Sequence, residues 1–373
     1  MSLRVEVRHD RPSLDMRLEL PEGAITSVVG PSGSGKTSTL RLVAGLWTPA
    51  AGLVAFGGET WFASASGVNL PPRARSIGVV PQRYALFPHL TACENVEASL
   101  LHLPRAGRTP RAKAALARAH VSGLDGRYPH ELSGGQQQRV AVARAIAREP
   151  RVLLLDEPFS SVDRSTRKHL YGELKLLHAE LGCTVMLVTH DLDEAALLSS
   201  HLCLIRRGRL VQAGSTQDVL ARPASAEAAR LLDYGNVFRA SVVSHDRARR
   251  LSLLDWNGVR LVAPLDDRVG PGQPVDWAVS HAEVRPADAA GQRPGDNIVP
   301  ATVRDIVTLG DDVHLRLAPD HLPALTLHMK VSRHVAHHRH LSAASPLRVR
   351  LTPSALVTMA PSEDGDAGGR PHE

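Results

Sequence analysis

Residues 30–37 read GPSGSGKT and decide the fold of the chain. They match G-x-x-x-x-G-K-[ST], a loop whose backbone N–H groups cradle phosphate. An apolar, β-branched run precedes the loop at residues 24–29, and a helical pattern follows it at residues 38–44. The loop is therefore expected between a strand and a helix, the setting that such a phosphate site requires. A glycine-rich turn with a chance lysine is the alternative, and this setting disfavours it.

The residues of this loop predict how it holds a nucleotide. Glycines let the backbone curl inward, and the N-terminus of the following helix adds positive potential. Lys36 is expected to reach the β- and γ-phosphates, and the Thr37 hydroxyl is expected to bind Mg²⁺. The residues predicted to bind the nucleotide here are Gly30, Pro31, Ser32, Gly33, Ser34, Gly35, Lys36, Thr37 and Ser38.

The composition bounds what the rest of the chain can be. Its 373 residues are enough for two domains. The 44 Lys+Arg against 38 Asp+Glu give a net charge of +6, which is more typical of a solvated surface than of a nucleic-acid site, so no nucleic-acid partner is expected. Three scattered cysteines favour a reducing compartment over disulfides or zinc. With no signal peptide and no long apolar run, any membrane role is expected to be peripheral.

Two carboxylates end a second apolar run, RVLLLDEP, at residues 151–158. ATP hydrolysis needs a metal ligand and a group that activates water, besides the phosphate cradle. Asp156 could hold Mg²⁺, and Glu157, next along the chain, could polarise the attacking water. A simple strand end would also explain adjacent carboxylates, but the phosphate loop upstream favours the catalytic interpretation.

Two further polar residues follow predicted strands. His190 comes just after the strand predicted at residues 184–188 and could orient the attacking water, while Gln82 follows residues 77–80 and could ligate Mg²⁺. The predicted catalytic residues are therefore Lys36, Glu157 and His190. The predicted metal ligands are Thr37, Gln82 and Asp156.

A second helix N-terminus lies at LSGGQ, residues 132–136, where Ser133 is a good N-cap for a helix that runs to about residue 147. Its free N–H donors make a second phosphate-binding surface. Because the N-terminus after the first loop already occupies the site on its own chain, this second tip is expected to close over a nucleotide on another copy. That implies a head-to-tail dimer with two ATP molecules between the subunits. The binding residues predicted here are Ser133, Gly134, Gly135 and Gln136.

These motifs, in this order, resemble those of ATP-binding-cassette (ABC) transporter ATPases over about residues 1–235. The resemblance implies an α/β P-loop (RecA-like) ATPase core with a helical insert at about residues 83–150, and it implies ATP and Mg²⁺ as ligands. It assigns the Q-loop to Gln82, the signature motif to Ser133, Gly135 and Gln136, Walker B to Asp156, the catalytic glutamate to Glu157, the D-loop to Asp163 in SSVD, and the switch histidine to His190.

The sequence departs from the family pattern at three places: the contact to adenine, Pro81 where a bulky apolar residue is common, and SSVD where SALD or SSLD is typical. The family usually stacks adenine on an aromatic residue near the second strand, but no Phe, Tyr or Trp precedes Trp47. Either His9 or Arg8 is expected to take that place, or the contact is absent.

The helical insert and the C-terminal part have their own patterns. Helices are predicted at residues 91–101 and 110–119, with a loop at 104–109 between them. From residue 237 onward, short alternating runs predict an all-β domain, residues 236–360, which resembles the paired OB-like TOBE barrels of bacterial importers. The runs from Phe238 and Val299 are alike and indicate an internal duplication. HVAHHRH is expected to be an exposed basic loop, and residues 361–373 a disordered tail.

The resemblance implies an importer ATPase on the cytoplasmic face of the inner membrane. A homodimer would pass its motion to a separate integral-membrane permease through residues 82–88, and a periplasmic binding protein would deliver the solute. DNIVPATV at residues 296–303 resembles molybdate importers, whereas YALFPHLTACENV resembles the wider group that includes iron and polyamine importers. A soluble ABC-type ATPase acting on DNA or ribosomes and a binding module without ATPase activity are the alternatives, and the filled catalytic positions disfavour the latter.

Overall fold

The computed structural model describes residues 2–160, 162–287 and 295–361. It divides the chain into two units, Met1–Leu220 and Ala221–Glu373. The sequence placed this boundary at residue 235. In the structure, α8 (Ala226–Leu231) packs against the second unit's strands β12 and β15, so the last helix of the predicted ATPase domain lies with the second unit.

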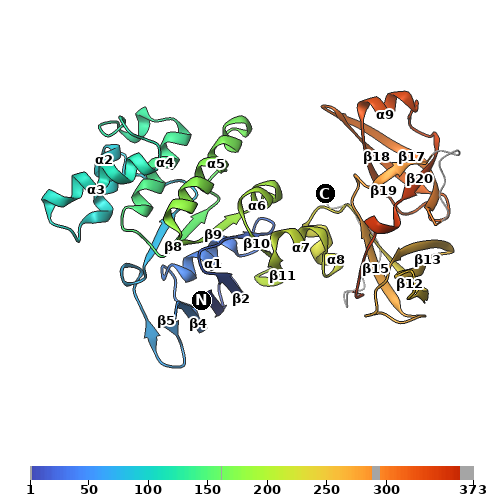
Figure 1. The fold of residues 1–373 in the computed structure, drawn as a ribbon, viewed down its shortest axis with the longest axis horizontal. Helices are drawn as coiled ribbons and strands as arrows, with labels where there is room; N and C mark the ends of the chain where they lie inside the picture. Colours follow the sequence, from blue (N-terminus) through green and yellow to red (C-terminus); the bar gives the residue numbers. More distant parts are fainter. Residues whose placement is uncertain (1, 161, 288–294, 362–373) are drawn as a thin grey trace. The chain divides into compact units, whose positions relative to one another are not determined.

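The first unit is built on one sheet with the strand order β6-β5-β4-β1-β2-β11-β10-β3-β9-β8-β7 (Figure 1). Its strands are β1 (Ser2–His9), β2 (Leu14–Pro21), β3 (Ile25–Val29), β4 (Ala51–Phe56), β5 (Glu59–Ala63), β6 (Val68–Asn69), β7 (Ile77–Val80), β8 (Val152–Asp156), β9 (Thr184–Thr189), β10 (His201–Arg206) and β11 (Arg209–Ser215). The neighbours β10, β3, β9, β8 and β7 pair in parallel. Every residue of β3, β8 and β9 is buried, as expected for parallel strands covered on both faces.

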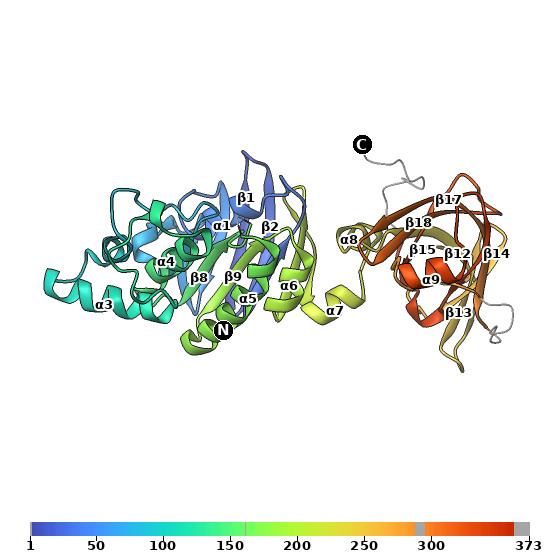
Figure 2. The ribbon, with the colours of Figure 1, turned by 90° about the horizontal axis from the view of Figure 1, so that it is seen from above.

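The helices of this unit include the predicted insert. They are α1 (Lys36–Val43), α2 (Ala92–Glu97), α3 (Arg105–Arg118), α4 (Gly134–Ile146), α5 (Arg164–Leu181), α6 (Leu192–Leu198) and α7 (Thr216–Ala221). The insert, α2 to α4, lies between β7 and β8 in the chain and packs together as one group. Figures 1 and 2 place α2 and α3 at the end of this unit that is furthest from α6. The α/β core with a helical insert is confirmed.

Local predictions were wrong at three places. Residues 105–109 are the first part of α3 and not a loop, because Pro110 lies inside the helix with its ring exposed instead of starting it. The short strands β5 and β6 were not predicted. The segment HVAHHRH, residues 334–340, was expected to be a loop, but most of it lies in α9 (Arg333–His338) of the second unit. Ser332 caps this helix by accepting from the Val335 N–H.

The second unit is all-β apart from its short helices, as predicted, and contains two five-stranded sheets. Its strands are β12 (Asn236–Asp246), β13 (Leu251–Trp256), β14 (Val259–Pro264), β15 (Pro274–Val279), β16 (Val284–Pro286), β17 (Asn297–Leu309), β18 (Asp312–Pro319), β19 (Leu327–Ser332), β20 (Pro346–Leu351) and β21 (Val357–Met359). One sheet has the order β14-β13-β12-β15-β21 and the other has the order β16-β20-β17-β18-β19.

The two sheets repeat one connectivity, which supports the duplication expected from the sequence. In each half a long strand pairs with the hairpin strand that follows it and with the fourth strand of that half. The ladders even shift register at matching positions, after Val242 and after Val303. The fifth strand of each half is exchanged: β16 pairs with β20, and β21 pairs with β15. The halves therefore cannot separate without breaking both sheets.

Two asparagine side chains also join the two halves, because each one bonds to the backbone of the other half. The buried amide of Asn236 bonds both the N–H and the carbonyl of His328 in the other half, and the buried amide of Asn297 bonds both groups of Val262. Each amide satisfies a donor and an acceptor that burial would otherwise leave unpaired.

Residues 362–373, most of the tail predicted to be disordered, lie outside the described residues. Within the part of the chain that the structure describes, no helix is both long and apolar enough to cross a bilayer.

Candidate functional site

The loop at residues 30–37 joins β3 to α1, as predicted, and α1 begins at Lys36, two residues earlier than expected. The N-cap Gly35 has φ = 99°, a left-handed conformation that favours glycine. A Cβ on Gly30 would lie 2.2 Å from the Ile205 carbonyl oxygen. Glycine is needed at position 30 because the loop lies directly against β10.

A distant turn supports the same loop. The Gly208 N–H, in the turn between β10 and β11, donates to the Ser34 carbonyl at 3.0 Å, and the Gly208 carbonyl accepts from the Asp15 N–H at 2.8 Å. The phosphate loop is thus held by the β1–β2 hairpin and by the β10–β11 hairpin together.

Lys36 is buried within the loop. Its Nζ donates to the carbonyl oxygens of Gly30 at 2.8 Å and Pro31 at 3.1 Å, and it lies 4.0 Å from Glu157 Oε1. Burial lowers the pKa of the ammonium, while Glu157 and Asp156 oppose that change. The site therefore holds a partly desolvated cation that a phosphate oxygen can pair with.

Thr37 and Asp156 meet although they are far apart in the chain. The Thr37 hydroxyl donates to Asp156 Oδ1 at 2.8 Å. Burial at the end of β8 raises the pKa of Asp156, and the hydrogen bond from Thr37 opposes that rise. A hydroxyl and a carboxylate in contact supply the oxygen ligands that Mg²⁺ prefers, so this pair fits the predicted metal.

Glu157 is the centre of the remaining cluster. Its carboxylate accepts from Gln82 Nε2 at 3.0 Å and lies 3.4 Å from His190 Nδ1. Its backbone has φ = 44° and donates to the Val188 carbonyl at 2.9 Å. Because β7, β8 and β9 are adjacent and parallel, the residues that follow them meet at one edge of the sheet. The structure thus brings together Lys36, Gln82, Asp156, Glu157 and His190.

Residues 133–136, which we call the signature tip, begin α4 elsewhere on the unit. Ser133 Oγ accepts from the Gln136 N–H at 3.3 Å, and the Ser133 N–H donates to Gln136 Oε1 at 2.9 Å. Ser133 and Gly134 are exposed, and a Cβ on Gly135 would meet nothing within 4 Å. The side-chain bonds given for Ser133 and Gln136 join these two residues to each other, and the Ser133 carbonyl accepts from the Gln137 N–H in the same helix.

The D-loop segment links Glu157 to α5. Ser160 Oγ donates to the Glu157 carbonyl at 2.9 Å. Asp163 is the N-cap of α5 and accepts from the Thr166 N–H at 3.0 Å. Ser161 of the predicted SSVD motif lies outside the described residues.

The residue proposed to stack on adenine has another partner in the structure. The His9 ring stacks on Trp47, with ring centroids 5.7 Å apart and planes 21° apart. Arg41 covers Trp47, with its guanidinium carbon 5.1 Å from the ring centroid. Arg8 is exposed. The replacement for the adenine contact stays a prediction.

A groove lies beside the segment that follows Gln82. It has a volume of about 460 Å³ and is lined by Ile77, Gly78, Val79, Ala85, Phe87, Ala98, Ser99, Arg144, Ala145 and Arg148. Phe87 is 44% exposed. Arg144 of α4 donates to the carbonyls of Tyr84 and Ala85, both at 2.7 Å, so α4, the signature helix that begins at the signature tip, forms part of the groove wall.

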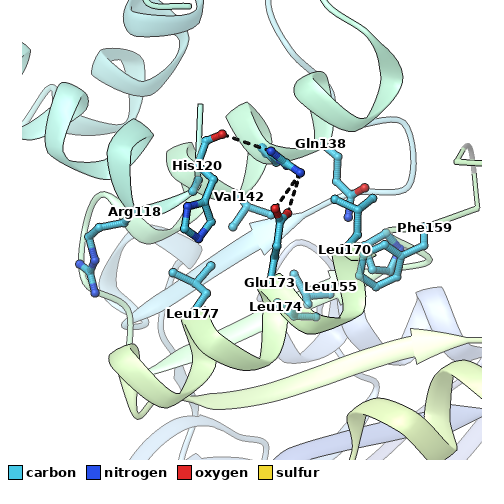
Figure 3. Close-up of a pocket in the computed structure, with 13 residues that line it drawn as sticks. Arg118, His120, Gln138, Val142, Leu155, Phe159, Leu170, Glu173, Leu174 and Leu177 are labelled. Carbon is cyan, nitrogen blue, oxygen red and sulfur yellow. Dashed lines mark hydrogen bonds and ion pairs between the residues drawn. The ribbon is translucent and has the colours of Figure 1, made fainter. Parts of the chain in front are cut away.

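A small cavity of about 40 Å³ separates α4 from α5 (Figure 3). Leu170, Leu174 and Leu177 of α5 line it from below. Arg139 of α4 spans the helices by donating to Glu173 at 2.8 Å and to the His120 carbonyl at 3.2 Å. The cavity is mainly apolar, and Phe159 also lines it. These contacts fix α5 to the signature helix.

The sequence did not single out a polar cluster behind His190. The Thr189 hydroxyl donates to Glu194 Oε2 at 2.9 Å and accepts from the Asp191 N–H at 3.0 Å, and Asp191 accepts from the Glu194 N–H at 3.1 Å. Burial raises the pKa of Glu194 to about 7. The acidic stretch DLDE directly after His190 was the available signal.

Comparisons with known proteins point in one direction. A family model described as ABC transporter matches residues 14–160. A spermidine/putrescine import ATP-binding protein of Rubrobacter xylanophilus is 39% identical over 311 residues, covering 82% of this chain and 79% of that protein. An Fe(3+) ions import ATP-binding protein of Brucella abortus is 37% identical over 312 residues, covering 83% of this chain and 84% of that protein.

Two more comparisons extend this result. A molybdenum import ATP-binding protein of Albidiferax ferrireducens is 38% identical over 307 residues, covering 81% of this chain and 82% of that protein. Among solved structures, a dimeric ATP-binding cassette in a post-hydrolysis state bound to ADP and Pi is 31% identical with a TM-score of 0.50. That match covers 58% of this chain and 99% of the cassette.

The raised pKa of Glu194 predicts a stability that depends on pH. Between the ordinary pKa of 4.5 and about 7 the folded state binds more protons than the unfolded state, so stability falls as the pH rises through this window. Glu194→Gln removes the cost of ionising a buried carboxyl. The free energy of unfolding of the variant minus that of the unmodified protein should be about 2–3 kcal/mol larger at about pH 8 than at about pH 5.

The measurement is urea denaturation of both proteins at the two pH values. Asp193→Asn is the matched control, because Asp193 lies in the same first turn of α6 but is exposed. A stability difference between Glu194→Gln and the unmodified protein that stays constant with pH would contradict the assignment.

Proposed function

This chain belongs to the ABC transporter family as an import ATP-binding subunit, and it is an ATPase that uses ATP and Mg²⁺. On that premise we propose that two copies close head-to-tail over two ATP molecules and drive solute uptake through a separate permease. The separation of the two phosphate-binding parts carries the proposal. The Lys36–Glu157 cluster lies at the sheet edge, whereas the signature tip is exposed and bonded to itself.

One half of each site binds the nucleotide. The backbone N–H groups at the N-terminus of α1 and the buried ammonium of Lys36 bind its phosphates. Thr37 and Asp156 supply oxygen ligands for the metal. Gln82 donates to Glu157 through its amide nitrogen, which leaves its amide oxygen for the metal. Bound Mg²⁺ neutralises charge on the phosphates during hydrolysis.

Glu157 is proposed to activate the attacking water. It is a carboxylate within 4.0 Å of Lys36 Nζ, and Gln82 and His190 lie closer still. As a general base it holds the water and takes its proton. His190, which is 62% exposed on its side chain, is placed to orient the water on the open side.

The other half of each site comes from the signature tip of the partner copy. The tip is a helix N-terminus whose backbone N–H groups and dipole favour a phosphate. The capping box leaves the N–H groups of Gly134 and Gly135 available to such a ligand. Among the residues that the structure describes, none packs closely enough to explain glycine at position 135, because a Cβ there would meet nothing within 4 Å. A closely approaching partner nucleotide explains it.

The groove is the proposed docking site for a cytoplasmic helix of the permease. Its lining includes Val79 before Gln82 and Ala85 after it, so a helix seated on it contacts the same segment that reaches Glu157. Phe87 supplies an exposed apolar anchor, and Arg144 and Arg148 supply positive charge for an acidic residue of the helix. With such docking, the proposed location of the subunit is the cytoplasmic face of the inner membrane, where it would act as a peripheral protein.

The proposed solute is an oxyanion such as molybdate, delivered by a periplasmic binding protein. The support is the likeness of residues 296–303 to molybdate importers and a relative named for molybdenum import. Iron(III) and polyamines are the alternatives, because relatives of similar identity are named for those solutes. The second unit would then be regulatory or dimer-forming.

Glu157→Gln is expected to bind ATP but to hydrolyse it at least ~100-fold more slowly, because the general base is lost. It should accumulate as an ATP-bound dimer, measured by light scattering during size exclusion. Lys36→Ala should bind ATP weakly and stay monomeric.

Cysteines introduced at Ser34 and Ser133 should form a crosslink between the two subunits when ATP is bound. Hydrolysis by Glu157→Gln at the unmodified rate would refute its role, and a strict monomer without crosslinks would refute the dimer.

Phe87→Asp is expected to weaken copurification with the permease at least ~tenfold, because it places a charge in an apolar contact. The matched control is Leu176→Asp, at a leucine that is 69% exposed on α5 and does not line the groove. Equal retention of the permease by both variants would show that it docks elsewhere.

Vesicles containing the assembled importer are expected to take up radiolabelled molybdate with ATP. Spermidine and iron(III) serve as parallel substrates with the same vesicles and the same binding-protein preparation. Uptake of either one without molybdate uptake would replace the oxyanion by that solute, and it would leave the ATPase mechanism unaffected.

A further inference from the structure

The turn that presents His190 is held on both sides. Thr189 and Asp191 flank the histidine, and both are fixed by the hydrogen bonds that join them to Glu194. We call Thr189, Asp191 and Glu194 the switch frame. His190 itself is largely exposed, so the frame and not its own packing determines where the imidazole lies.

Arg167 of α5 joins the switch frame to the D-loop. Its Nε and one terminal nitrogen donate to the Val162 carbonyl at 3.2 and 3.0 Å. Its other terminal nitrogen lies 3.5 Å from Asp191 Oδ2. Val162 is buried and directly precedes Asp163, so one guanidinium contacts both the D-loop backbone and the turn of His190.

The position of Arg167 is unfavourable for α5 alone. It lies close to the helix N-terminus, where the dipole disfavours a cation and favours an acidic residue. The carboxylate of Asp191 faces the guanidinium from the neighbouring element and offsets this. The contact with Asp191 on the neighbouring element therefore compensates for a position that the dipole of α5 disfavours.

The helix that carries Arg167 is itself anchored. Arg139 of α4 donates to Glu173 of α5 at 2.8 Å, which joins the two helices. A shift of α4 or of the D-loop on subunit closure would be carried by α5 to Arg167 and from there to Asp191. The contacts form one continuous path from two proposed interface elements to His190.

We propose that Arg167 is a positioning residue for ATP hydrolysis, which couples the D-loop to the switch frame so that subunit closure sets His190 against Glu157. This inference rests on the proposed function. Arginine suits the role because its planar fork donates in two directions at once, whereas lysine supplies only a point charge.

The test compares steady-state kinetics of the full-length protein. Arg167→Met is expected to lower kcat at least ~tenfold while KM for ATP changes less than ~twofold, because Lys36 and the loop still bind the nucleotide. Arg167→Lys should retain an intermediate kcat. Lys168→Met, the next residue along α5 and exposed, is the control and should behave as the unmodified protein. A kcat of Arg167→Met equal to that of Lys168→Met would overturn the proposal.

A double-mutant cycle tests the path through Asp191. Asp191→Asn keeps a side chain that can cap α6 but removes the charge facing Arg167. It should lower kcat, whereas Asp193→Asn should not. The double variant Arg167→Met/Asp191→Asn should lose no more activity than the more affected single variant. Multiplying losses would show that the two residues act independently and would overturn the proposal.

The two hypotheses fail separately. If Glu157→Gln does not form an ATP-dependent dimer, the proposed function fails whatever Arg167 does. If Glu157→Gln dimerises and Arg167→Met retains the control's kcat, only the coupling role of Arg167 fails. Should Arg167→Met not fold, the comparison of Asp191→Asn with Asp193→Asn decides alone, and equal kcat values there overturn the proposal.

Discussion

The parallel pairing of β3, β9, β8 and β7 is the constraint on which the site depends. Parallel strands end at the same edge of a sheet, so whatever follows each strand must meet there. The phosphate loop follows β3, His190 follows β9, Glu157 follows β8 and Gln82 follows β7. Lys36 follows β3 and Glu157 follows β8, so the two could not lie within 4.0 Å of each other if either of those strands ran in the opposite direction.

Charge concentration at this edge has consequences for both chemistry and stability. Burial lowers the pKa of Lys36 and raises that of Asp156, which means that it destabilises the charged form of each side chain. A nearby opposite charge or a bound metal offsets this cost. Their mutual contacts with Thr37 and Glu157 satisfy them within the chain. The same groups are then suited to bind phosphate and Mg²⁺, because those ligands replace partners of the same chemistry.

The first unit also carries polar and apolar surfaces that its own fold leaves open. The signature tip presents a helix N-terminus whose first residues, Ser133 and Gly134, are exposed, and the groove presents Phe87 beside Arg144. Both belong to or touch α4, and α4 is bonded to α5 through Arg139. Arg167 extends this connection to the turn of His190. The proposed motions of the dimer, the permease and the catalytic site therefore all involve α4 and α5.

In the second unit, by contrast, the exchanged strands and the buried amides of Asn236 and Asn297 bond the two halves to each other.

The sequence by itself determined the α/β core, the loop at residues 30–37 and the identity of the motif residues. These follow from local patterns: an apolar strand, a glycine loop and a helix cap each act over a few residues. It misjudged residues 105–109 because a proline was given more weight than the exposed face on which it lies. Only the tertiary structure decided that Gln82 and His190 share Glu157, that Arg167 reaches Asp191, and that β16 and β21 are exchanged. Those contacts depend on strand order and on long-range pairing, which no short stretch of sequence encodes.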